Sequence, residues 1–363
     1  MRIFFLLLLC LCVAACQPSP TQAPAAISAP TAKPTAVSLN PEQIKRAAEY
    51  NAAHDGISML VMVNGKIIFE DYPNRGAANR PHELASGTKS FSCAMAVAAV
   101  ADGFLKLDNR VADTLTEWRG DPPKSKMTIR QLLSLTGGLE TGDERGNVPT
   151  YAQAIQAPAL FDPGQRFQYG AVPFQVFGEV MQRKLEWKKQ SPLDYLKARV
   201  FDPIGLQIGE WHSGADGNPD LPSGARLTAR EWAKYGELIR LGGTWEGKTI
   251  LPAQTLDECF QGTPQNPAYG LTWWLNRDVP PDLRASIRQL TAGTEDLWNV
   301  PGVTRDLVFA AGAGKQRMFV SRAMNLVVVR QATGILQVLA GQRRPTFSDA
   351  EFLSLLLTSQ SFK

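Results

Sequence analysis

Histidine is scarce in this sequence, with only three copies, at His54, His82 and His212. None stands at a spacing typical of a metal site, which argues against a metalloenzyme and leaves a Ser-His-Asp triad without support. No metal and no other cofactor is expected. An excess of one charge is also lacking, because 38 Lys plus Arg face 34 Asp plus Glu. This near balance argues against a nucleic acid or another polyanion as a partner.

A long apolar run is missing as well. Outside the N-terminus, no run approaches the length of about 18 residues that a membrane-spanning helix needs. Apolar or small residues follow Met1 and Arg2, which predicts a signal peptide over residues 1–15. Val13-Ala14-Ala15-Cys16 resembles a bacterial lipobox, and this implies that Cys16 is acylated and is the only membrane anchor. The alternative is ordinary signal cleavage beside an incidental cysteine.

The N-terminal segment also bears on location. The lipobox implies a protein on a bacterial membrane, outside the cytoplasm, and Gln17 in place of an aspartate suggests the outer membrane facing the periplasm if the source is Gram-negative. Residues 16–39 are rich in Pro, Ala, Ser and Thr, with little to bury, and predict a tether. The folded part is expected to begin at Asn40-Pro41, where Gln43 completes a capping box.

Cysteine is equally limited. Of the five copies, Cys10 and Cys12 leave with the signal peptide and Cys16 carries the lipid, so only Cys93 and Cys259 remain. An oxidising compartment permits a bridge between them. Because Cys93 lies in an apolar helical pattern, however, we expect two buried thiols.

Hydrophobic periodicity divides the remaining chain into strand-rich ends and a helical middle. Asn64-Gly65 joins two apolar runs by the strongest short hairpin signal. Residues 40–107 and 262–363 are predicted to form one α/β sheet domain, and residues 108–261 a mostly helical domain inserted between them, so the fold class is α+β. The predicted strands cover residues 57–63, 66–70, 269–274, 307–309, 317–320 and 326–329, and the predicted helices cover residues 86–101, 128–135, 172–185, 192–200, 229–241 and 349–358.

One motif opens a helix that carries no charge beyond its first turn. After Ser86-Gly87-Thr88-Lys89 the sequence is uncharged up to Ala101, and a helix that is apolar on every face is buried. Residues three apart share a helix face, so the Ser86 hydroxyl and the Lys89 amine can meet. Burial disfavours the ammonium form, so Lys89 can accept the proton that Ser86 must lose to attack a carbonyl. The alternative is a helix start that Ser86 caps and from which Lys89 reaches solvent.

Tyr169 is the candidate for a second proton-carrying group. It follows the turn-rich segment Asp162-Pro163-Gly164 and precedes a helix with Pro173 in its first turn. It therefore lies on a connection, where a phenol can relay protons to a leaving group. The alternative is a tyrosine that only packs under the loop.

The candidate oxyanion site is a small-residue segment formed by Gly312, Ala313, Gly314 and Lys315, which leads directly into a strand. Small residues let the backbone approach a substrate closely, so that its N–H groups can stabilise an oxyanion. The alternative is a plain glycine turn.

In this order, Ser86-x-x-Lys89, Tyr169 and the segment 312–315 resemble the serine β-lactamase-like superfamily, which groups class C β-lactamases, D-alanyl-D-alanine peptidases and related esterases and amidases. The resemblance implies a β-lactamase/transpeptidase-like fold, an antiparallel sheet flanked by helices with a mostly helical inserted domain. It implies a serine hydrolase with Ser86 as nucleophile, Lys89 as base, Tyr169 as proton relay and the N–H groups of Ser86 and about Lys315 at the oxyanion. The implied partner is a small-molecule or peptide substrate, and the oligomeric state stays open.

Two departures from the family pattern bear on the substrate. Members commonly have Ser-Asn after the tyrosine, where this chain has Gly170-Ala171, so the amide that orients a substrate is missing. The third motif usually begins with Lys or His, whereas here it begins with Gly312. The cation that would recognise a β-lactam carboxylate is therefore missing, unless Lys315 supplies it from a shifted position. We therefore rank β-lactam hydrolysis below a general esterase, amidase or peptidase activity.

Two other function classes compete with a hydrolase. The segment 242–249 matches the phosphate-loop pattern, but it follows a helix instead of a strand and Pro252 interrupts the helix that should follow, so we expect a turn. A non-catalytic binding or sensor lipoprotein on the same scaffold is the stronger rival, because two of the three family motifs are altered. The retention of Ser86, Lys89 and Tyr169 favours the enzyme.

Overall fold

The computed structural model describes residues 37–142, 148–284 and 297–358. The predicted signal peptide, Cys16 and nearly all of the predicted tether lie outside these residues, so secretion and acylation stay predictions. The described residues all belong to one compact unit. The predicted domain boundaries at residues 107/108 and 261/262 also stay predictions.

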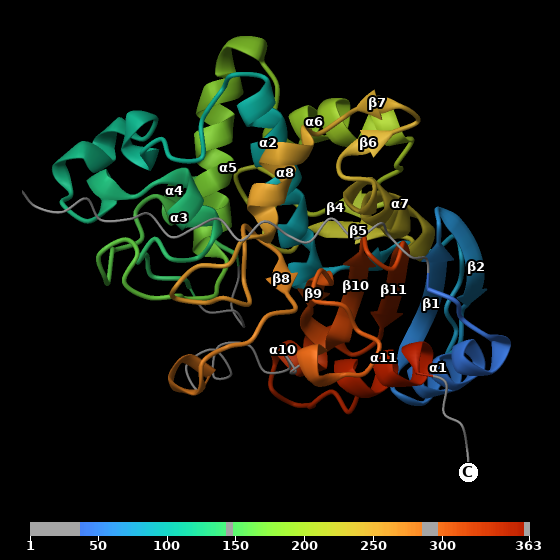
Figure 1. Cartoon of the computed structure of the whole chain (residues 1–363). Helices are drawn as coiled ribbons and strands as arrows, with labels where there is room; N and C mark the ends of the chain where they lie inside the picture. Colours follow the sequence, from blue (N-terminus) through green and yellow to red (C-terminus); the bar gives the residue numbers. More distant parts are fainter. Residues whose placement is uncertain (1–36, 143–147, 285–296, 359–363) are drawn as a thin grey trace, which may run out of the picture. The chain divides into compact units, whose positions relative to one another are not determined.

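The centre of the fold is a six-stranded antiparallel sheet built from both ends of the chain, in the order β2-β1-β11-β10-β9-β8 (Figure 1). The Asn64-Gly65 turn joins β1 to β2 as predicted, and β1 pairs on its other side with β11, with Leu60 opposite Val329. The α+β class and the antiparallel sheet are confirmed. The strands of this sheet are β1 (Gly56–Val63), β2 (Lys66–Asp71), β8 (Trp274–Leu275), β9 (Val308–Gly312), β10 (Gln316–Ser321) and β11 (Leu326–Ala332).

Helices cover both faces of this sheet. Met318 and Phe319 are neighbours on β10, so their side chains point to opposite faces. Gly236 of α7 lies against Met318, and Phe352 of α11 stacks on Phe319 with ring centroids 6.4 Å apart. The helices of the described residues are α1 (Pro41–Ala53), α2 (Ser90–Ala101), α3 (Ile129–Leu133), α4 (Tyr151–Ala154), α5 (Val172–Leu185), α6 (Pro192–Leu196), α7 (Ala229–Arg240), α8 (Ala253–Asp257), α10 (Ile335–Leu339) and α11 (Asp349–Leu357).

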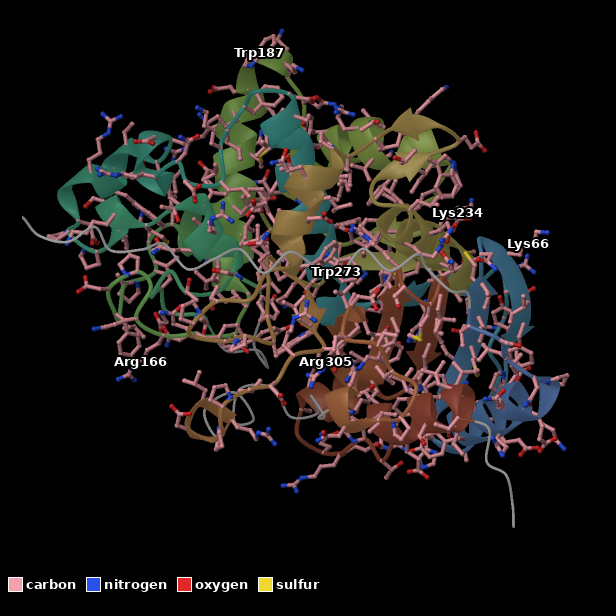
Figure 2. The ribbon with its side chains drawn as sticks, viewed as in Figure 1. Lys66, Arg166, Trp187, Lys234, Trp273 and Arg305 are labelled. Carbon is pink, nitrogen blue, oxygen red and sulfur yellow. A yellow bond between two sulfur atoms is a disulfide. The ribbon has the colours of Figure 1, made fainter. Side chains whose placement is uncertain are left out.

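The helix ends follow local signals in the sequence. Asn40 caps α1 and Gln43 returns the bond, as predicted. The predicted helix 172–185 is α5, and the predicted helix 192–200 is divided into α6 and a π-helical turn, Lys197–Phe201. The 3-10 turn that follows α5, η5 (Glu186–Lys188), carries Trp187, which is 74% exposed and points outward, whereas Trp273 is buried inside (Figure 2).

Two small sheets complete the fold, one of β3 (His82–Glu83), β5 (Ala225–Leu227) and β4 (Glu210–Trp211), the other of β6 (Thr244–Trp245) and β7 (Lys248–Thr249). The phosphate-loop pattern at residues 242–249 is the β6–β7 hairpin, so the expected turn is confirmed. The strand predicted over 269–274 is wrong for most of its length. Thr272 has a φ of 72°, which turns the chain before β8 begins at Trp274.

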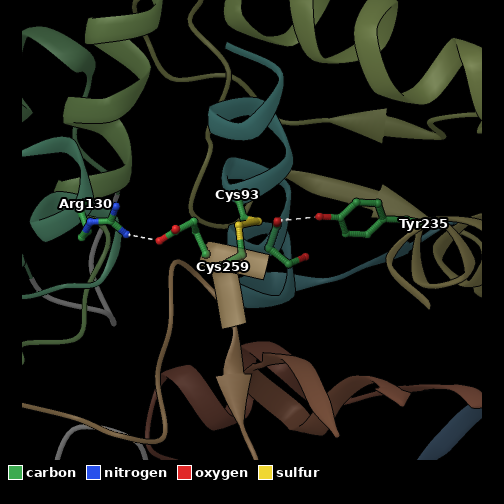
Figure 3. The surroundings of a disulfide bond; sticks show 6 residues. Cys93, Arg130, Tyr235 and Cys259 are labelled. Carbon is green, nitrogen blue, oxygen red and sulfur yellow. Dashed lines mark hydrogen bonds and ion pairs between the residues drawn. A yellow bond between two sulfur atoms is a disulfide. The ribbon is translucent and has the colours of Figure 1, made fainter. Parts of the chain in front are cut away.

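The prediction of two free thiols is wrong, because Cys93 of α2 and Cys259 form a disulfide. The bridge joins α2 to the short turn η8 (Glu258–Phe260), which follows α8 (Figure 3). Both cysteines are fully buried, as expected. Burial was therefore a poor guide to their redox state, because two small buried thiols that face each other can also pair.

The described residues contain neither a membrane-spanning helix nor a cluster of metal-binding side chains. In the ranges 37–142, 148–284 and 297–358, no helix has both the length and the apolar character needed to cross a membrane. The same ranges contain no group of three or more His, Cys, Asp or Glu side chains arranged to hold a metal ion.

Candidate active site

Ser86 and Lys89 lie on a 3-10 turn, η1 (Ala85–Lys89), and not on the α-helix predicted from residue 86, because α2 begins only at Ser90. In a 3-10 turn side chains three apart eclipse each other, which brings a serine and a lysine at this spacing together. Ala85, directly before the serine, has a φ of 46°, which is uncommon for a residue with a side chain.

Strand β5 holds this turn in place from both ends. The N–H of Leu84 donates to the Ala225 carbonyl at 3.0 Å, and the N–H of Ala225 donates to Thr88 Oγ1 at 3.2 Å. The bonds come from one strand residue and bracket Ser86. The turn that carries Ser86 is therefore held on both sides by hydrogen bonds to a strand outside it.

Lys89 is 4% exposed, and its amine reaches the serine. The amine donates to Ser86 Oγ at 2.8 Å and to the Pro222 carbonyl at 3.3 Å. These bonds aim the amine at the hydroxyl from a buried position. The expectation that the two side chains meet is confirmed, and the alternative in which Lys89 reaches solvent is wrong.

Tyr169 lies on the predicted connection before α5 and forms an aromatic wall beside the amine. The Lys89 Nζ atom is 5.0 Å from the centroid of the Tyr169 ring and 5.3 Å from that of Phe174. Trp274 stacks on Tyr169 with centroids 5.7 Å apart. The tyrosine is thus next to the serine–lysine pair, in surroundings poor in water.

The segment that carries Pro222 belongs to the site, although no sequence pattern predicted it. The hydroxyl of Ser223 donates to Asp220 Oδ2 at 3.0 Å, and Asp220 Oδ1 is buried without a hydrogen-bond partner in the described part of the chain. Burial raises the pKa of Asp220 above its ordinary value, against the opposing effects of Ser223 and Lys89. A carboxyl group with a perturbed pKa therefore lies close to the amine.

Gly312 brings strand β9 against the turn of Ser86. A Cβ atom at this position would lie 2.0 Å from the Leu84 carbonyl oxygen and 3.1 Å from the Gly87 nitrogen. Only glycine fits there without displacing one of the two backbones. The next residue, Ala313, starts the tight turn Ala313–Lys315 between β9 and β10, so this turn lies near Ser86 through its first residue.

Lys315 lies at the other end of that turn, and its side chain forms an ion pair with Asp349. Its side chain is 6% exposed, and its Nζ atom lies 2.8 Å from Asp349 Oδ2. The charge that the third motif lacks therefore does not come from Lys315. The Lys315 backbone N–H as oxyanion donor stays a prediction, as does that of Ser86.

The altered second motif has a packing cause. A Cβ atom on Gly170 would lie 2.3 Å from Thr141 Cβ and 2.5 Å from the Thr141 carbonyl oxygen. The N–H of Ala171 donates to the same carbonyl at 3.1 Å. The serine common in the family thus has no room here, because Thr141 occupies its place.

Comparisons with known proteins agree with this geometry. A model of the beta-lactamase family matches residues 44–334. A beta-lactamase from Pseudomonas fluorescens is 30% identical over 172 residues, which cover 42% of this chain and 44% of that protein. The match therefore spans less than half of that relative.

Solved structures share the fold at low sequence identity. A penicillin-binding protein homologue from Caulobacter crescentus has a TM-score of 0.61 at 15% identity, covering 81% of this chain and 92% of its own. EstCE1, a hydrolase with promiscuous acyltransferase activity, has a TM-score of 0.61 at 16% identity, and the match covers 86% of this chain and 97% of EstCE1. A family VIII carboxylesterase has a TM-score of 0.60 at 17% identity, and the match covers 82% of this chain and 94% of that protein. Since the family match covers most of the sequence, the chain belongs to the beta-lactamase family.

Proposed function

We propose that this protein is a serine hydrolase that forms an acyl-enzyme at Ser86 on an ester, amide or peptide substrate. The observation that carries the proposal is the 2.8 Å contact between Lys89 Nζ and Ser86 Oγ, made by an amine that is 4% exposed. A buried amine favours its uncharged form, which can take the serine proton.

The proposed reaction has two balanced halves. In the first, Ser86 Oγ bonds to the carbonyl carbon while its proton moves to Lys89 Nζ, and the bond to the leaving group then breaks as that group takes up a proton through Tyr169. In the second, a water molecule gives a proton to Lys89 as it attacks the carbonyl carbon of acyl-Ser86. The bond from that carbon to Ser86 Oγ then breaks, the proton returns from Lys89 to Oγ, and the acid and free Ser86 are released. Backbone N–H groups of Ser86 and of the turn after Gly312 hold the oxyanion in both.

The altered motifs favour substrates that need neither a side-chain amide nor a cation. Gly170-Ala171 offers no amide group, and the Lys315 ammonium is paired with Asp349. The aromatic rings of Tyr169, Phe174 and Trp274 instead suit an apolar acyl or alcohol group. We therefore place simple esters ahead of β-lactams as substrates.

The test is covalent labelling of the folded protein with a fluorophosphonate, followed by mass spectrometry of the modified peptide. We expect one label, on Ser86, and none in Ser86→Ala. Ser92→Ala is the matched control, because Ser92 is buried in the helix that follows and its hydroxyl has no partner in the described residues. Labelling that persists in Ser86→Ala would overturn Ser86 as the nucleophile, and a wild-type protein that takes no label would favour the binding or sensor protein.

We also propose that the mature protein is held outside the cytoplasm on a bacterial membrane by lipid on Cys16. The Cys93–Cys259 disulfide supports this, since such bonds persist in oxidising compartments. Labelled palmitate should enter the wild-type protein and not Cys16→Ser. Equal incorporation in both would refute acylation at Cys16.

A further inference from the structure

A small cavity lies behind the turn that joins β9 to β10. Gly314 and Lys315 of the turn line it together with Arg330, Arg343 and Phe347. The space that the centre of a water molecule can occupy in it is about 10 Å³, so the cavity has room for one water molecule or one monatomic ion. Neither the family assignment nor the proposed hydrolysis gives this cavity a role.

Arg330 is the central group of the cavity. It is 0% exposed, and its Nη1 donates to the Lys315 carbonyl at 2.7 Å while Nη2 donates to the His54 carbonyl. Its guanidinium lies over the Phe347 ring, 3.7 Å from the centroid. Its Nε–H is buried and has no hydrogen-bond partner in the described residues, and within them Arg330 makes no ion pair.

The charges around Arg330 do not balance it. Asp349 lies 2.8 Å from both Lys315 Nζ and Arg317 Nε, so one carboxylate already serves two cations. Asp55, on the rim, pairs with Arg343 at 2.5 Å. Of the described charged side chains, Asp55, Lys315, Arg330 and Arg343 line the cavity, and neither Asp55 nor Asp349 forms an ion pair with Arg330. Burial lowers the pKa of Arg330 to about 9, with partial compensation from Asp349, which agrees with a guanidinium that has no counterion of its own.

We propose that this cavity binds a small monovalent anion of the halide class, chloride in a physiological medium. An anion there supplies the missing negative charge and accepts the Arg330 Nε–H, and the small volume excludes sulfate and carboxylates. Because Gly314 and Lys315 line the cavity, the bound anion also braces the turn that follows Gly312. The proposal does not depend on the proposed hydrolysis.

The direct test is crystallographic. Crystals of the wild-type protein grown in chloride are soaked in sodium bromide, and data are collected at the bromine absorption edge. We expect an anomalous peak in the cavity beside Arg330. A water molecule without anomalous signal at that position would overturn the proposal.

The second test measures stability in solution at constant ionic strength. Replacing sodium gluconate by sodium chloride to about 0.2 M should raise the unfolding midpoint by about 3 °C, the shift expected for a dissociation constant on the order of 10 mM. Sodium sulfate should give no such rise. Midpoints that are equal in all three salts would contradict the inference.

A pair of variants links the effect to the cavity. Arg343 is half-exposed at the rim, so Arg343→Gln should fold, lose most of the chloride-dependent rise and weaken the bromide peak. Arg305→Gln is the control, since Arg305 is 57% exposed, pairs with Asp278 and does not line the cavity. An unchanged chloride response in Arg343→Gln, or a loss in both variants, would overturn the assignment.

Discussion

Asp220 shows how a single buried carboxyl group can oppose folding at a site where chemistry is expected. Its pKa is raised, mainly by burial, so the folded protein binds the proton more tightly than the unfolded chain does. The folded state is therefore favoured below the unfolded pKa, and stability is lost as the pH rises through the folded pKa. Residues that a protein keeps at such a stability penalty tend to serve function.

Asp220→Asn should accordingly stabilise the protein at pH 7, by about 1 kcal/mol in the free energy of unfolding. The asparagine has no charge to bury, and its oxygen can still accept the Ser223 hydroxyl bond. Urea unfolding of both proteins between pH 4 and 8 should show a difference that grows with pH. The exposed Asp162→Asn is the control, and a difference in Asp220→Asn that is flat or reversed would contradict the argument.

Lys89 can be tested with a substitution that keeps the charge and removes the proton acceptor. Arginine is always protonated, so Lys89→Arg cannot take the Ser86 proton, and the rate of fluorophosphonate labelling should fall about 10²–10⁴-fold. The rate is measured at several pH values by gel or mass spectrometry. A variant that reacts within tenfold of the wild type would show that another group is the base.

At the level of elements, the contact between β9 and η1 positions the site. Gly312→Ala would put a Cβ atom 2.0 Å from the Leu84 carbonyl oxygen, so the strand and the turn must separate. We expect a loss of more than about 2 kcal/mol in unfolding free energy and a larger proportional loss of labelling at Ser86. Gly120→Ala is the matched control because a Cβ atom there meets nothing within 4 Å. A Gly312→Ala protein as stable and reactive as this control would refute the contact.

Helix α11 is tied to the sheet by a buried ionic cluster at its first residue, Asp349. Burial alone would raise the pKa of this carboxyl, but Arg317 and Lys315 outweigh burial and lower it. A lowered folded pKa means that the stabilisation is present above the unfolded pKa and is lost as the pH falls through the folded pKa.

Asp349→Asn should thus destabilise the protein at pH 7 by about 3–5 kcal/mol, because two buried cations lose their ion pairs with this carboxylate. The deficit should shrink on acidification below about pH 4, where the wild type loses the same charge. Thermal unfolding scans across this pH range measure it. Asp257→Asn, which removes a half-exposed partner of Arg322, should change stability little at any pH, and a similar loss there would argue against a special role of Asp349.

At the level of the whole molecule, predictions from the sequence succeeded where the signal was local. The Asn64-Gly65 hairpin, the cap at Asn40 and the span of α5 depend on neighbours a few residues apart, and all are confirmed. The spacing of Ser86 and Lys89 is local as well. Features set by tertiary packing were missed, such as the Pro222 contact with Lys89, which spans 133 residues, and the clash that Thr141 would impose on a larger residue 170.

The disulfide is the clearest case of such a long-range feature, and its energetic effect is large. Cys93 is one turn of α2 beyond Lys89, and Cys259 is 166 residues away, so the bridge closes a long loop in the unfolded chain. In the chain-entropy account a loop of this length corresponds to about 5 kcal/mol of stabilisation.

The Cys93→Ala/Cys259→Ala double variant should therefore unfold at a clearly lower temperature than the wild type. Well below its unfolding midpoint it should still be labelled at Ser86, because η1 is held by β5 and not by the bridge. Dithiothreitol should lower the midpoint of the wild type and leave the double variant unchanged. Two titratable thiols in the unreduced, denatured wild type would show instead that the bridge does not form.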